Sequence, residues 1–317
     1  MIYIIKLKGE KKMKEENKIN NTTKRYEGVN VKFGVNDAGE AVAIKLDRST
    51  RPNIRIHGGS GSGKTVLLKT IIGNLNAEYG NSDIDIFMID ASIGGGYRDY
   101  VAPKGGEWKI RFYNYANPMV ASCMDVFDYL TAMAEYRVKS LSLYGVEDIE
   151  SWNEMFPEQF RSVVIIIDEY QRFFGTSSEK SFCNMVNTIA SVGYDVDMHI
   201  IMASQSDKGT KIGLNETARD SFELNICLKC YDELTSTSTV GVPDAMNLKI
   251  GEGFFVQRDS REPVHFKVNP EDEVKNTIVI NNMAIVMSDE ERAAMQEMMK
   301  QMVASNKFVG DETVEDK

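Results

Sequence analysis

Residues 58–65 read Gly-Gly-Ser-Gly-Ser-Gly-Lys-Thr, and this segment constrains the fold more than any other part of the chain. It fits the pattern G-x-x-x-x-G-K-[ST], in which a glycine-rich loop turns its backbone N–H groups inward around a phosphate chain. Residues 53–57 before the loop alternate polar and apolar side chains, as a strand does, and residues 65–72 after it are apolar at a helical period. Because a strand, the loop and a helix must follow in this order, we expect a nucleotide-binding domain.

The residue types in this loop predict how a nucleotide is held. We expect Lys64 to reach the β- and γ-phosphates of ATP and the Thr65 hydroxyl to coordinate Mg²⁺, so the predicted cofactors are ATP and Mg²⁺. The predicted nucleotide-binding residues are Gly58, Gly59, Ser60, Gly61, Ser62, Gly63, Lys64 and Thr65.

A second motif follows about a hundred residues further on, where the apolar run 163–167 ends in Asp168 and Glu169. A strand of this kind raises an acid to the carboxyl edge of a parallel sheet, beside the phosphate loop. We expect Asp168 to hold Mg²⁺, directly or through water, and Glu169 to activate the attacking water as general base. Gln205 ends the next apolar strand, and it is either a sensor of the γ-phosphate or a polar strand end without a role.

Composition narrows the class of protein. The chain has 317 residues, 42% of them apolar, and a net charge of −10. A protein that coats nucleic acid is usually basic, so the negative net charge argues against this class. It is compatible with DNA held in a narrow pore by a few local Lys and Arg residues. No apolar run approaches the ~20 residues that cross a bilayer, and the expected location is cytoplasmic, with recruitment to a membrane by a partner.

The four cysteines are expected to be free thiols in a reducing compartment. Cys227 and Cys230 form a C-x-x-C pair, which is half of a common zinc site. The pair lies in a strand-like run, 224–231, and residues three apart on a strand point to opposite faces. We therefore do not expect the two thiols to hold one metal ion.

Three regions are expected along the chain: a basic, flexible N-terminal arm at 1–27, an ATPase domain at 28–268, and a C-terminal extension at 269–317. Met13 is an alternative to Met1 as the natural start. In the extension, 288–291 form a capping box that opens an amphipathic, methionine-rich helix, followed by an acidic tail. That helix packs on the core or a neighbouring subunit, or binds a partner.

Several independent blocks occur along the chain between about 29 and 266: Phe33-Gly-Val-Asn-Asp-Ala-Gly-Glu-Ala-Val42, the phosphate loop, Phe87-Met-Ile-Asp90, Glu135-Tyr-Arg137, Gly145-Val146, Trp152-Asn-Glu154, Asp168-Glu169, Met198-His-Ile-Ile-Met-Ala-Ser-Gln205, Gly213-Leu214 and Ile250-Gly-Glu-Gly253. In order and spacing these blocks resemble the FtsK/SpoIIIE motor domain.

The resemblance implies an α/β fold of the RecA-like P-loop NTPase class, with a mostly parallel sheet and helices on both faces, as the alternation of strand and helix patterns also predicts. It further implies a homo-hexameric ring that threads double-stranded DNA through a central channel with ATP. In the family pattern Gly58, Gly63, Lys64 and Thr65 bind nucleotide, Asp168 and Glu169 bind Mg²⁺ and activate water, and Gln205 is the sensor.

Two segments depart from the family pattern. Tyr194-Asp-Val-Asp197 stands where many relatives have basic residues, and Ser236-Thr-Ser-Thr239 stands where they carry Asp-Ser-Arg-Thr. The second change removes an arginine that makes an interface or catalytic contact in the family. Arg137 and Arg219 are the candidate replacements for such an arginine, which acts in trans on a neighbouring subunit. Lys180, Lys208 and Lys211 are either DNA phosphate contacts or solvated surface residues.

The leading functional hypothesis is an ATP-hydrolysing motor that translocates double-stranded DNA in conjugative transfer or maintenance of a mobile genetic element. The membrane-spanning N-terminus and winged-helix domain of full-length chromosome translocases are missing from the sequence, so separate membrane-anchored or DNA-processing partner proteins are expected. The alternatives are a type VII-like protein-export ATPase, although those usually carry several motor domains in tandem, a phage DNA-packaging ATPase and a non-hydrolysing nucleotide-dependent scaffold.

Overall fold

The computed structural model describes residues 28–46, 53–79, 84–91, 97, 111–116, 122–157, 159–205, 214–257, 260 and 262–268. Several predictions fall outside these residues: the N-terminal arm, the start at Met1 or Met13, the C-terminal helix and tail, and the lysines at 208 and 211.

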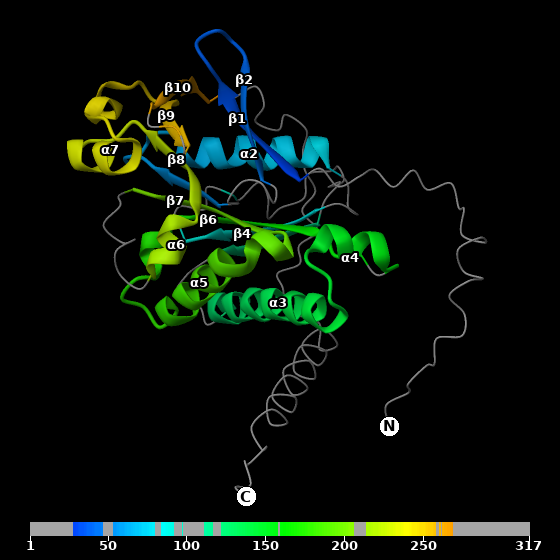
Figure 1. Ribbon diagram of the computed structural model, residues 1–317. Helices are drawn as coiled ribbons and strands as arrows, with labels where there is room; N and C mark the ends of the chain where they lie inside the picture. The colour runs from blue at the N-terminus through cyan, green and yellow to red at the C-terminus, as the bar shows by residue number, and fades with distance from the viewer. Residues whose placement is uncertain are drawn as a thin grey trace, which may run out of the picture.

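A ten-stranded sheet organises the described part of the chain, in the order β2-β1-β10-β9-β8-β3-β7-β6-β4-β5 (Figure 1). The six strands from β8 to β5 pair in parallel, and the other four extend the sheet by antiparallel pairing. The strands are β1 Val29–Val35, β2 Ala41–Leu46, β3 Asn53–His57, β4 Ile84–Asp90, β5 Arg111–Ala116, β6 Ser162–Asp168, β7 Met198–Ser204, β8 Phe222–Leu228, β9 Glu252–Gln257 and β10 Val264–Lys267.

Helices cover both faces of the parallel region (Figure 1). Helix α2 packs on one face, and α3 and α5 pack side by side on the other. The helices are α2 Lys64–Glu78, α3 Ser122–Tyr144, α4 Ile149–Met155, α5 Glu179–Val196, α6 Glu216–Asp220 and α7 Glu233–Val240, with 3-10 turns η2 Tyr170–Phe173 and η4 Pro243–Asn247. The predicted α/β architecture is confirmed.

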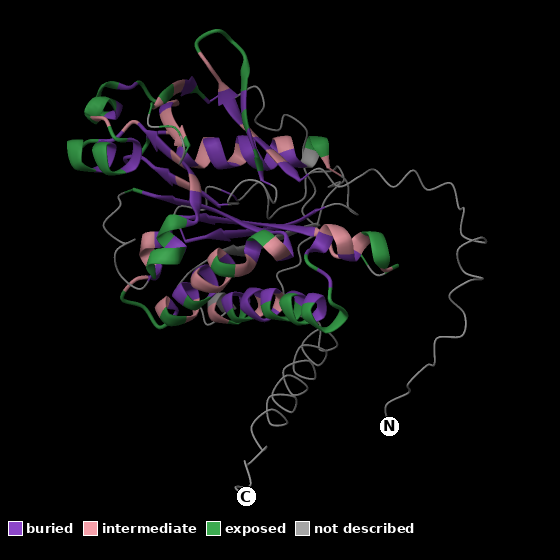
Figure 2. Ribbon diagram, viewed as in Figure 1, coloured by how far each residue is buried: buried purple, intermediate pink, exposed green. Residues whose placement is uncertain are grey.

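The central strands are apolar because both of their faces are covered. Every residue of β4, β6 and β7 is buried, as is typical of parallel strands between two helical layers. One core cluster lies between α2 and the sheet and includes Leu68, Ile71 and Ile166. The second lies beneath α3 and α5 and includes Phe127 and Phe182. In Figure 2 the buried residues follow the sheet and the inner sides of these helices.

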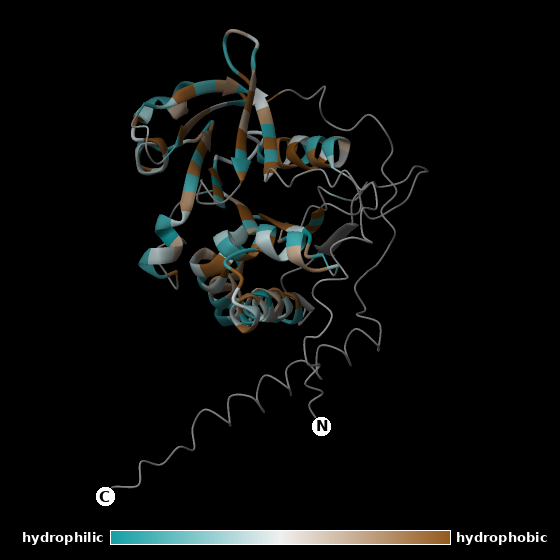
Figure 3. Cartoon of the chain, turned by 45° about the vertical axis from the view of Figure 1, so that its right-hand side comes forward, coloured by the Kyte–Doolittle hydropathy of each residue, from teal (hydrophilic) through white to brown (hydrophobic). Residues whose placement is uncertain are grey.

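Strands β1 and β2 form an N-terminal hairpin. Strand β2 alternates exposed and buried residues, and the two strands carry alternating hydrophilic and hydrophobic bands in Figure 3. The turn is closed by Asn36, whose side-chain oxygen accepts the backbone N–H groups of Ala38 (3.0 Å) and Glu40 (2.9 Å). None of the described helices is long and apolar enough to cross a membrane.

Candidate nucleotide-binding site

The glycine-rich loop lies between the end of β3 at His57 and the start of α2 at Lys64. Gly61 and Gly63 have φ angles of 73° and 106°, in a region that side chains with a Cβ rarely enter, so these two positions require glycine. Lys64 folds back over the loop, and its Nζ donates to the carbonyl oxygens of Gly58 (2.9 Å) and Gly59 (3.3 Å). The ammonium group of Lys64 therefore lies against the backbone of the loop.

The first turn of α2 is suited to an anion. It carries no acidic residue, and no side chain caps it among the described residues. The N–H groups of a helix start, together with its positive dipole end, favour a phosphate there. Ser62 is 2% exposed, and its hydroxyl has no hydrogen-bond partner in the described part of the chain. These features fit a bound phosphate chain.

The acidic side of the site is built by β6, which ends at Asp168 beside the loop. The Thr65 hydroxyl donates to Asp168 Oδ2 at 3.2 Å, and the hydroxyl of Tyr97 donates to the same oxygen at 3.1 Å. Burial and the neighbouring Glu169 and Asp90 carboxylates raise the pKa of Asp168 to about 6, against the opposing effects of the Tyr97 hydrogen bond and Lys64. A nearby cation stabilises the charged form of a carboxylate that is buried beside other carboxylates.

The donor set fits Mg²⁺. Within the described residues no group of three His, Cys, Asp or Glu side chains could hold a metal by itself. Magnesium at phosphate sites needs only one or two protein oxygens, because substrate phosphates and waters complete its octahedron. Thr65 and Asp168 supply such a pair, and the other oxygen of Asp168, Oδ1, is buried without a hydrogen-bond partner among the described residues.

Glu169 lies at the centre of the polar cluster. Its Oε1 is 3.4 Å from Lys64 Nζ, and its Oε2 accepts from the Gln205 amide at 2.9 Å and from the Gln171 amide. Its backbone is left-handed, with φ of 56°, which is uncommon for a residue other than glycine. The structure thus brings together all the residues predicted for the site, from three different strand ends.

Two aromatic residues at the site were not predicted. Tyr97 lies in the sequence between β4 and β5, and its hydroxyl donates to Asp168. Tyr231 donates its hydroxyl to the Ser60 carbonyl at 2.9 Å, and its ring lies so close to Gly59 that a Cβ there would meet it at 2.3 Å. Neither residue belongs to a spaced motif, so only their aromatic character could have suggested them.

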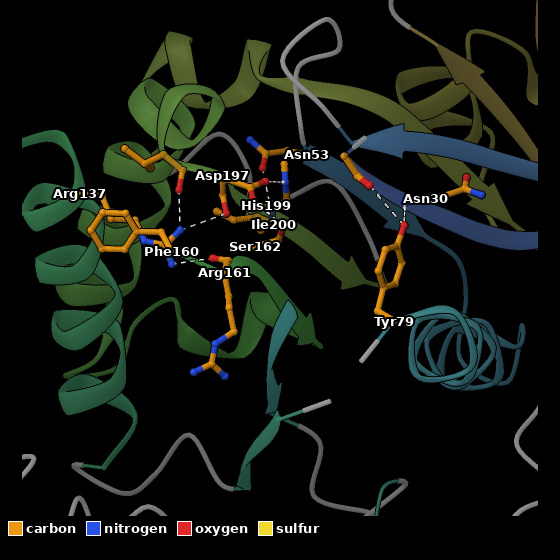
Figure 4. A network of polar contacts seen from close by, with 12 residues as sticks. Asn30, Asn53, Tyr79, Arg137, Phe160, Arg161, Ser162, Asp197, His199 and Ile200 are labelled. Atoms are coloured by element: carbon orange, nitrogen blue, oxygen red, sulfur yellow. Dashed lines mark hydrogen bonds and ion pairs between the residues drawn. The ribbon is translucent and has the colours of Figure 1, made fainter. Parts of the chain in front are cut away.

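Arg137 is not available as an arginine that acts on a neighbouring subunit. It is 4% exposed and donates to the backbone carbonyls of Val196 (2.6 Å) and Arg161 (2.7 Å), with its guanidinium over the Phe160 ring. Figure 4 shows this arrangement. Arg161 and Val196 precede β6 and β7, so the contacts lie at the amino edge of the sheet, whereas the phosphate loop follows the carboxyl end of β3. Arg219, on α6, and Lys180, on α5, are exposed.

The acidic segment 194–197 lies at the C-terminal end of helix α5. It forms the last turn of α5 and its cap, and Asp197 is buried. One carboxylate oxygen accepts from the Ser162 hydroxyl at 2.5 Å, and the other is 2.8 Å from the His199 ring nitrogen (Figure 4). The charge of Asp197 is therefore used inside the fold.

The cysteine pair also differs from its expected geometry. Strand β8 ends at Leu228, so Cys230 lies beyond it and the alternation of side chains along a strand does not separate the two thiols. They are close enough for their thiols to interact, and burial raises the pKa of Cys227 and of Cys230. Buried thiols with raised pKa values are unreactive.

The comparisons with known proteins identify the family and the fold. The model of the FtsK/SpoIIIE family matches residues 12–213, and the chain belongs to this family. It is 25% identical over 236 residues to the ESX-4 secretion system protein EccC4 of Mycobacterium tuberculosis, and 20% identical over 246 residues to the type VII secretion system protein EssC of Staphylococcus aureus. These alignments cover 71% and 75% of this chain but only 18% and 16% of the relatives, so the chain spans less than a fifth of their length.

Two solved structures share the fold. The cytoplasmic domain of the type VII secretion ATPase EccC of Thermomonospora curvata superposes with a TM-score of 0.62 at 19% identity, over 77% of this chain and 29% of that one. The pCW3 conjugation coupling protein TcpA, in a monomer form with ATPγS, superposes with a TM-score of 0.58 at 18% identity, over 88% of this chain and 73% of that one. The protein is therefore an FtsK/SpoIIIE-type P-loop ATPase in fold and family.

Proposed function

We propose that this protein is an ATP-hydrolysing motor that translocates double-stranded DNA in conjugative transfer or maintenance of a mobile genetic element. The observation that carries the hydrolytic part is the cluster of Lys64, Thr65, Asp168, Glu169 and Gln205 at one edge of the sheet. In this proposal residues 28–268 form the motor domain.

The chemistry begins with a competition for Lys64. In this structure its ammonium group pairs with Glu169 and two loop carbonyls. The β- and γ-phosphates of ATP are stronger partners for a lysine in the loop. When Lys64 turns to them, Glu169 keeps its contacts to the amides of Gln205 and Gln171, and its carboxylate is free to accept a proton.

Hydrolysis then follows an in-line displacement. The oxygen of a water bonds to the γ-phosphorus, the bond from that phosphorus to the bridging oxygen of ADP breaks, and Glu169 takes the water proton. Gln205, which is bonded to Glu169, orients the water or the γ-phosphate. When Mg²⁺ is bound, Thr65 and Asp168 would hold it, and its positive charge would neutralise the charge that develops on the phosphate oxygens.

The choice of DNA as substrate is supported by the extent of the likeness to TcpA, which covers most of both chains. We propose a homo-hexameric ring around the duplex, recruited by membrane-anchored or DNA-processing partner proteins. Because the net charge is −10, contacts to DNA phosphates must come from a few local cations such as Lys180.

A second candidate is a type VII-like protein-export ATPase. It is favoured by the curated relatives, EccC4 and EssC, which are secretion system proteins. The nucleotide chemistry would be the same, and only the polymer drawn through the ring would differ.

A translocation assay separates the two candidates. The full chain is mixed with ATP, Mg²⁺ and a linear duplex that carries a triplex-forming oligonucleotide, and release of that oligonucleotide is followed with time. The proposal predicts turnover stimulated by duplex DNA and ATP-dependent release, both absent in Glu169→Gln. ATP turnover that ignores duplex DNA but rises with the tail of a secreted substrate would replace the DNA motor by the export motor.

A further inference from the structure

A chain of buried hydrogen bonds runs beneath the nucleotide site and plays no part in the chemistry above. The hydroxyl of Tyr170 is 3.1 Å from Nε2 of His57, and Nδ1 of His57 is 2.8 Å from the hydroxyl oxygen of Thr239. Tyr170 and His57 are fully buried, and Thr239 is 4% exposed. The three residues lie in η2, at the end of β3 and in α7, so the chain of bonds links three segments that are far apart in sequence.

The hydrogen bond that the Thr239 hydroxyl donates determines which atom is the donor in each of the other hydrogen bonds. The Thr239 hydroxyl donates to the carbonyl oxygen of Thr235 at 2.6 Å, so its oxygen accepts from His57. His57 therefore carries its proton on Nδ1, and Nε2 accepts the hydroxyl proton of Tyr170. Burial and the positive charges of Arg55 and Lys64 hold the pKa of His57 well below its ordinary value, which keeps the ring neutral and this pattern intact.

The Tyr170 end of the chain bears directly on Glu169. The two residues are consecutive, and Glu169 has a left-handed backbone that persists only where its surroundings hold it. Two contacts fix the residue that follows. The Tyr170 ring stacks on Phe182 with centroids 6.4 Å apart, and its hydroxyl is held by His57. The backbone N–H of Arg172 then closes the turn on the Glu169 carbonyl at 3.0 Å.

From this geometry we infer that Tyr170, His57 and Thr239 are positioning residues for the general base, tying the backbone of Glu169 to helix α7. The inference rests on the proposed ATP hydrolysis with Glu169 as base. It gives a role to Thr239, the position of the segment 236–239 at which this chain keeps the threonine of the family's Asp-Ser-Arg-Thr run. The effect is on chemistry and not on nucleotide binding, because none of the three hydrogen bonds involves a residue of the phosphate loop.

Two substitutions test the chain at its two ends. Tyr170→Phe removes one hydroxyl and keeps the ring, while Thr239→Val keeps the shape and removes the acceptor of His57. Each is expected to lower the kcat for ATP about tenfold with KM changed less than twofold, because a general base displaced by a fraction of an ångström loses its alignment but not the bound substrate. The double variant should lose little more than either single one. Thr239→Ser, which keeps the hydroxyl, should stay within about twofold of the wild-type rate.

A matched control is Tyr79→Phe. The Tyr79 hydroxyl accepts from the Asn30 backbone N–H at 2.7 Å (Figure 4) and donates to the carbonyl oxygen of Gly28 at 3.3 Å. Tyr79 caps the C-terminal end of α2, at the opposite end of this helix from Lys64. This variant loses comparable hydrogen bonds, so it controls for a general loss of stability, and its kcat should be unchanged. If Tyr79→Phe lowers kcat as far as Tyr170→Phe does, or if Thr239→Val is fully active, the positioning role is refuted.

A second readout does not depend on catalysis. Backbone amide hydrogen exchange in the peptide that contains Glu169 should become at least tenfold faster in Tyr170→Phe and Thr239→Val, and should not change in Tyr79→Phe. Faster exchange in a protein that hydrolyses no ATP would support the structural link and refute the proposed function. Normal exchange in an active enzyme would refute the link alone.

Discussion

Replacing Asp168 by asparagine should stabilise the Mg²⁺-free protein at neutral pH while it abolishes ATP hydrolysis. Asp168 is 1% exposed, and burial together with the Glu169 and Asp90 carboxylates raises its pKa from 3.8 to about 6. The folded protein therefore binds this proton more tightly than the unfolded chain does. The carboxyl group costs no stability below about pH 4, and its cost grows as the pH rises through about 6.

The size of the effect follows from the two pKa values. Each tenfold change in an ionisation constant corresponds to about 1.4 kcal/mol, so the cost at neutral pH is about 3 kcal/mol. Asparagine cannot ionise and escapes this cost. Its amide nitrogen, if it takes the place of Oδ1, lacks a partner among the described residues, which costs about 1 kcal/mol. We expect Asp168→Asn to be more stable than wild type by about 2 kcal/mol at pH 7.5 and less stable by a few tenths to 1 kcal/mol at pH 4.

The assay is urea unfolding with EDTA at these two pH values, which avoid the pI of about 5.0. Saturating Mg²⁺ and ATPγS should make the wild type more stable than Asp168→Asn at pH 7.5, because a ligand at a hundred times its Kd stabilises the wild type by about 2.7 kcal/mol. Asp85→Asn is the matched control, since Asp85 lies at the other end of neighbouring strand β4 and pairs with Arg161 at 3.2 Å. Asp85→Asn should destabilise the protein at pH 7.5. If Asp168→Asn is equally destabilising at both pH values, the assignment of a buried carboxylate with a raised pKa is wrong.

Three further predictions concern other parts of the molecule. Lys64→Ala should weaken ATPγS binding about a hundredfold by fluorescence titration, since hydrogen bonds to a charged group contribute about 1.5–3 kcal/mol; affinity within threefold of wild type would contradict the role of Lys64. Gly193→Ala should lower the urea midpoint, because a Cβ there would lie 2.4 Å from the carbonyl oxygen of Met198 on β7, a cost of about 1–3 kcal/mol; an unchanged midpoint would mean that α5 can shift. His57→Gln should reduce the loss of stability that occurs as the pH falls below 6.5. Below that pH the unfolded chain protonates His57 while the buried ring stays neutral, so the wild type loses about 1.4 kcal/mol per pH unit through this residue. Parallel plots of unfolding free energy against pH for the two proteins would show that His57 does not titrate as proposed.

The parallel half of the fold was predictable because its signals are local. The runs ending at Ile89, Ile167 and Ala203 are nearly continuous apolar segments bounded by polar residues, and each is a central strand. Strands β5 and β10 were not predicted. Strand β10 is only four residues long, Val-His-Phe-Lys, and it exists because it pairs with β9, which no local pattern records.

In the candidate site, too, the residues with local sequence signals were predicted and those placed by long-range packing were not. The residues of the two motifs have fixed spacing and were all predicted, and Gln205 followed from the end of its strand. Tyr97 contacts Asp168, and the sequence around it has no hydrophobic periodicity that would have placed it there. The bond from His57 to Thr239 joins residues 182 positions apart, so it depends on how α7 packs. Arg137 was a candidate for contact with a neighbouring subunit, but it is buried with backbone carbonyls as partners, and carbonyls carry no sequence signature.

The central claim is that the cluster around Lys64 and Glu169 hydrolyses ATP, which excludes a non-hydrolysing scaffold. The most direct test is phosphate release by the full chain with Mg²⁺ and ATP, measured beside ATPγS binding for wild type and Glu169→Gln. The account predicts that both proteins bind ATPγS with similar affinity and that Glu169→Gln hydrolyses ATP at least a hundredfold more slowly, as expected when a general base is lost. Equal hydrolysis by the two proteins, or ATPγS binding with no hydrolysis by the wild type, would contradict it.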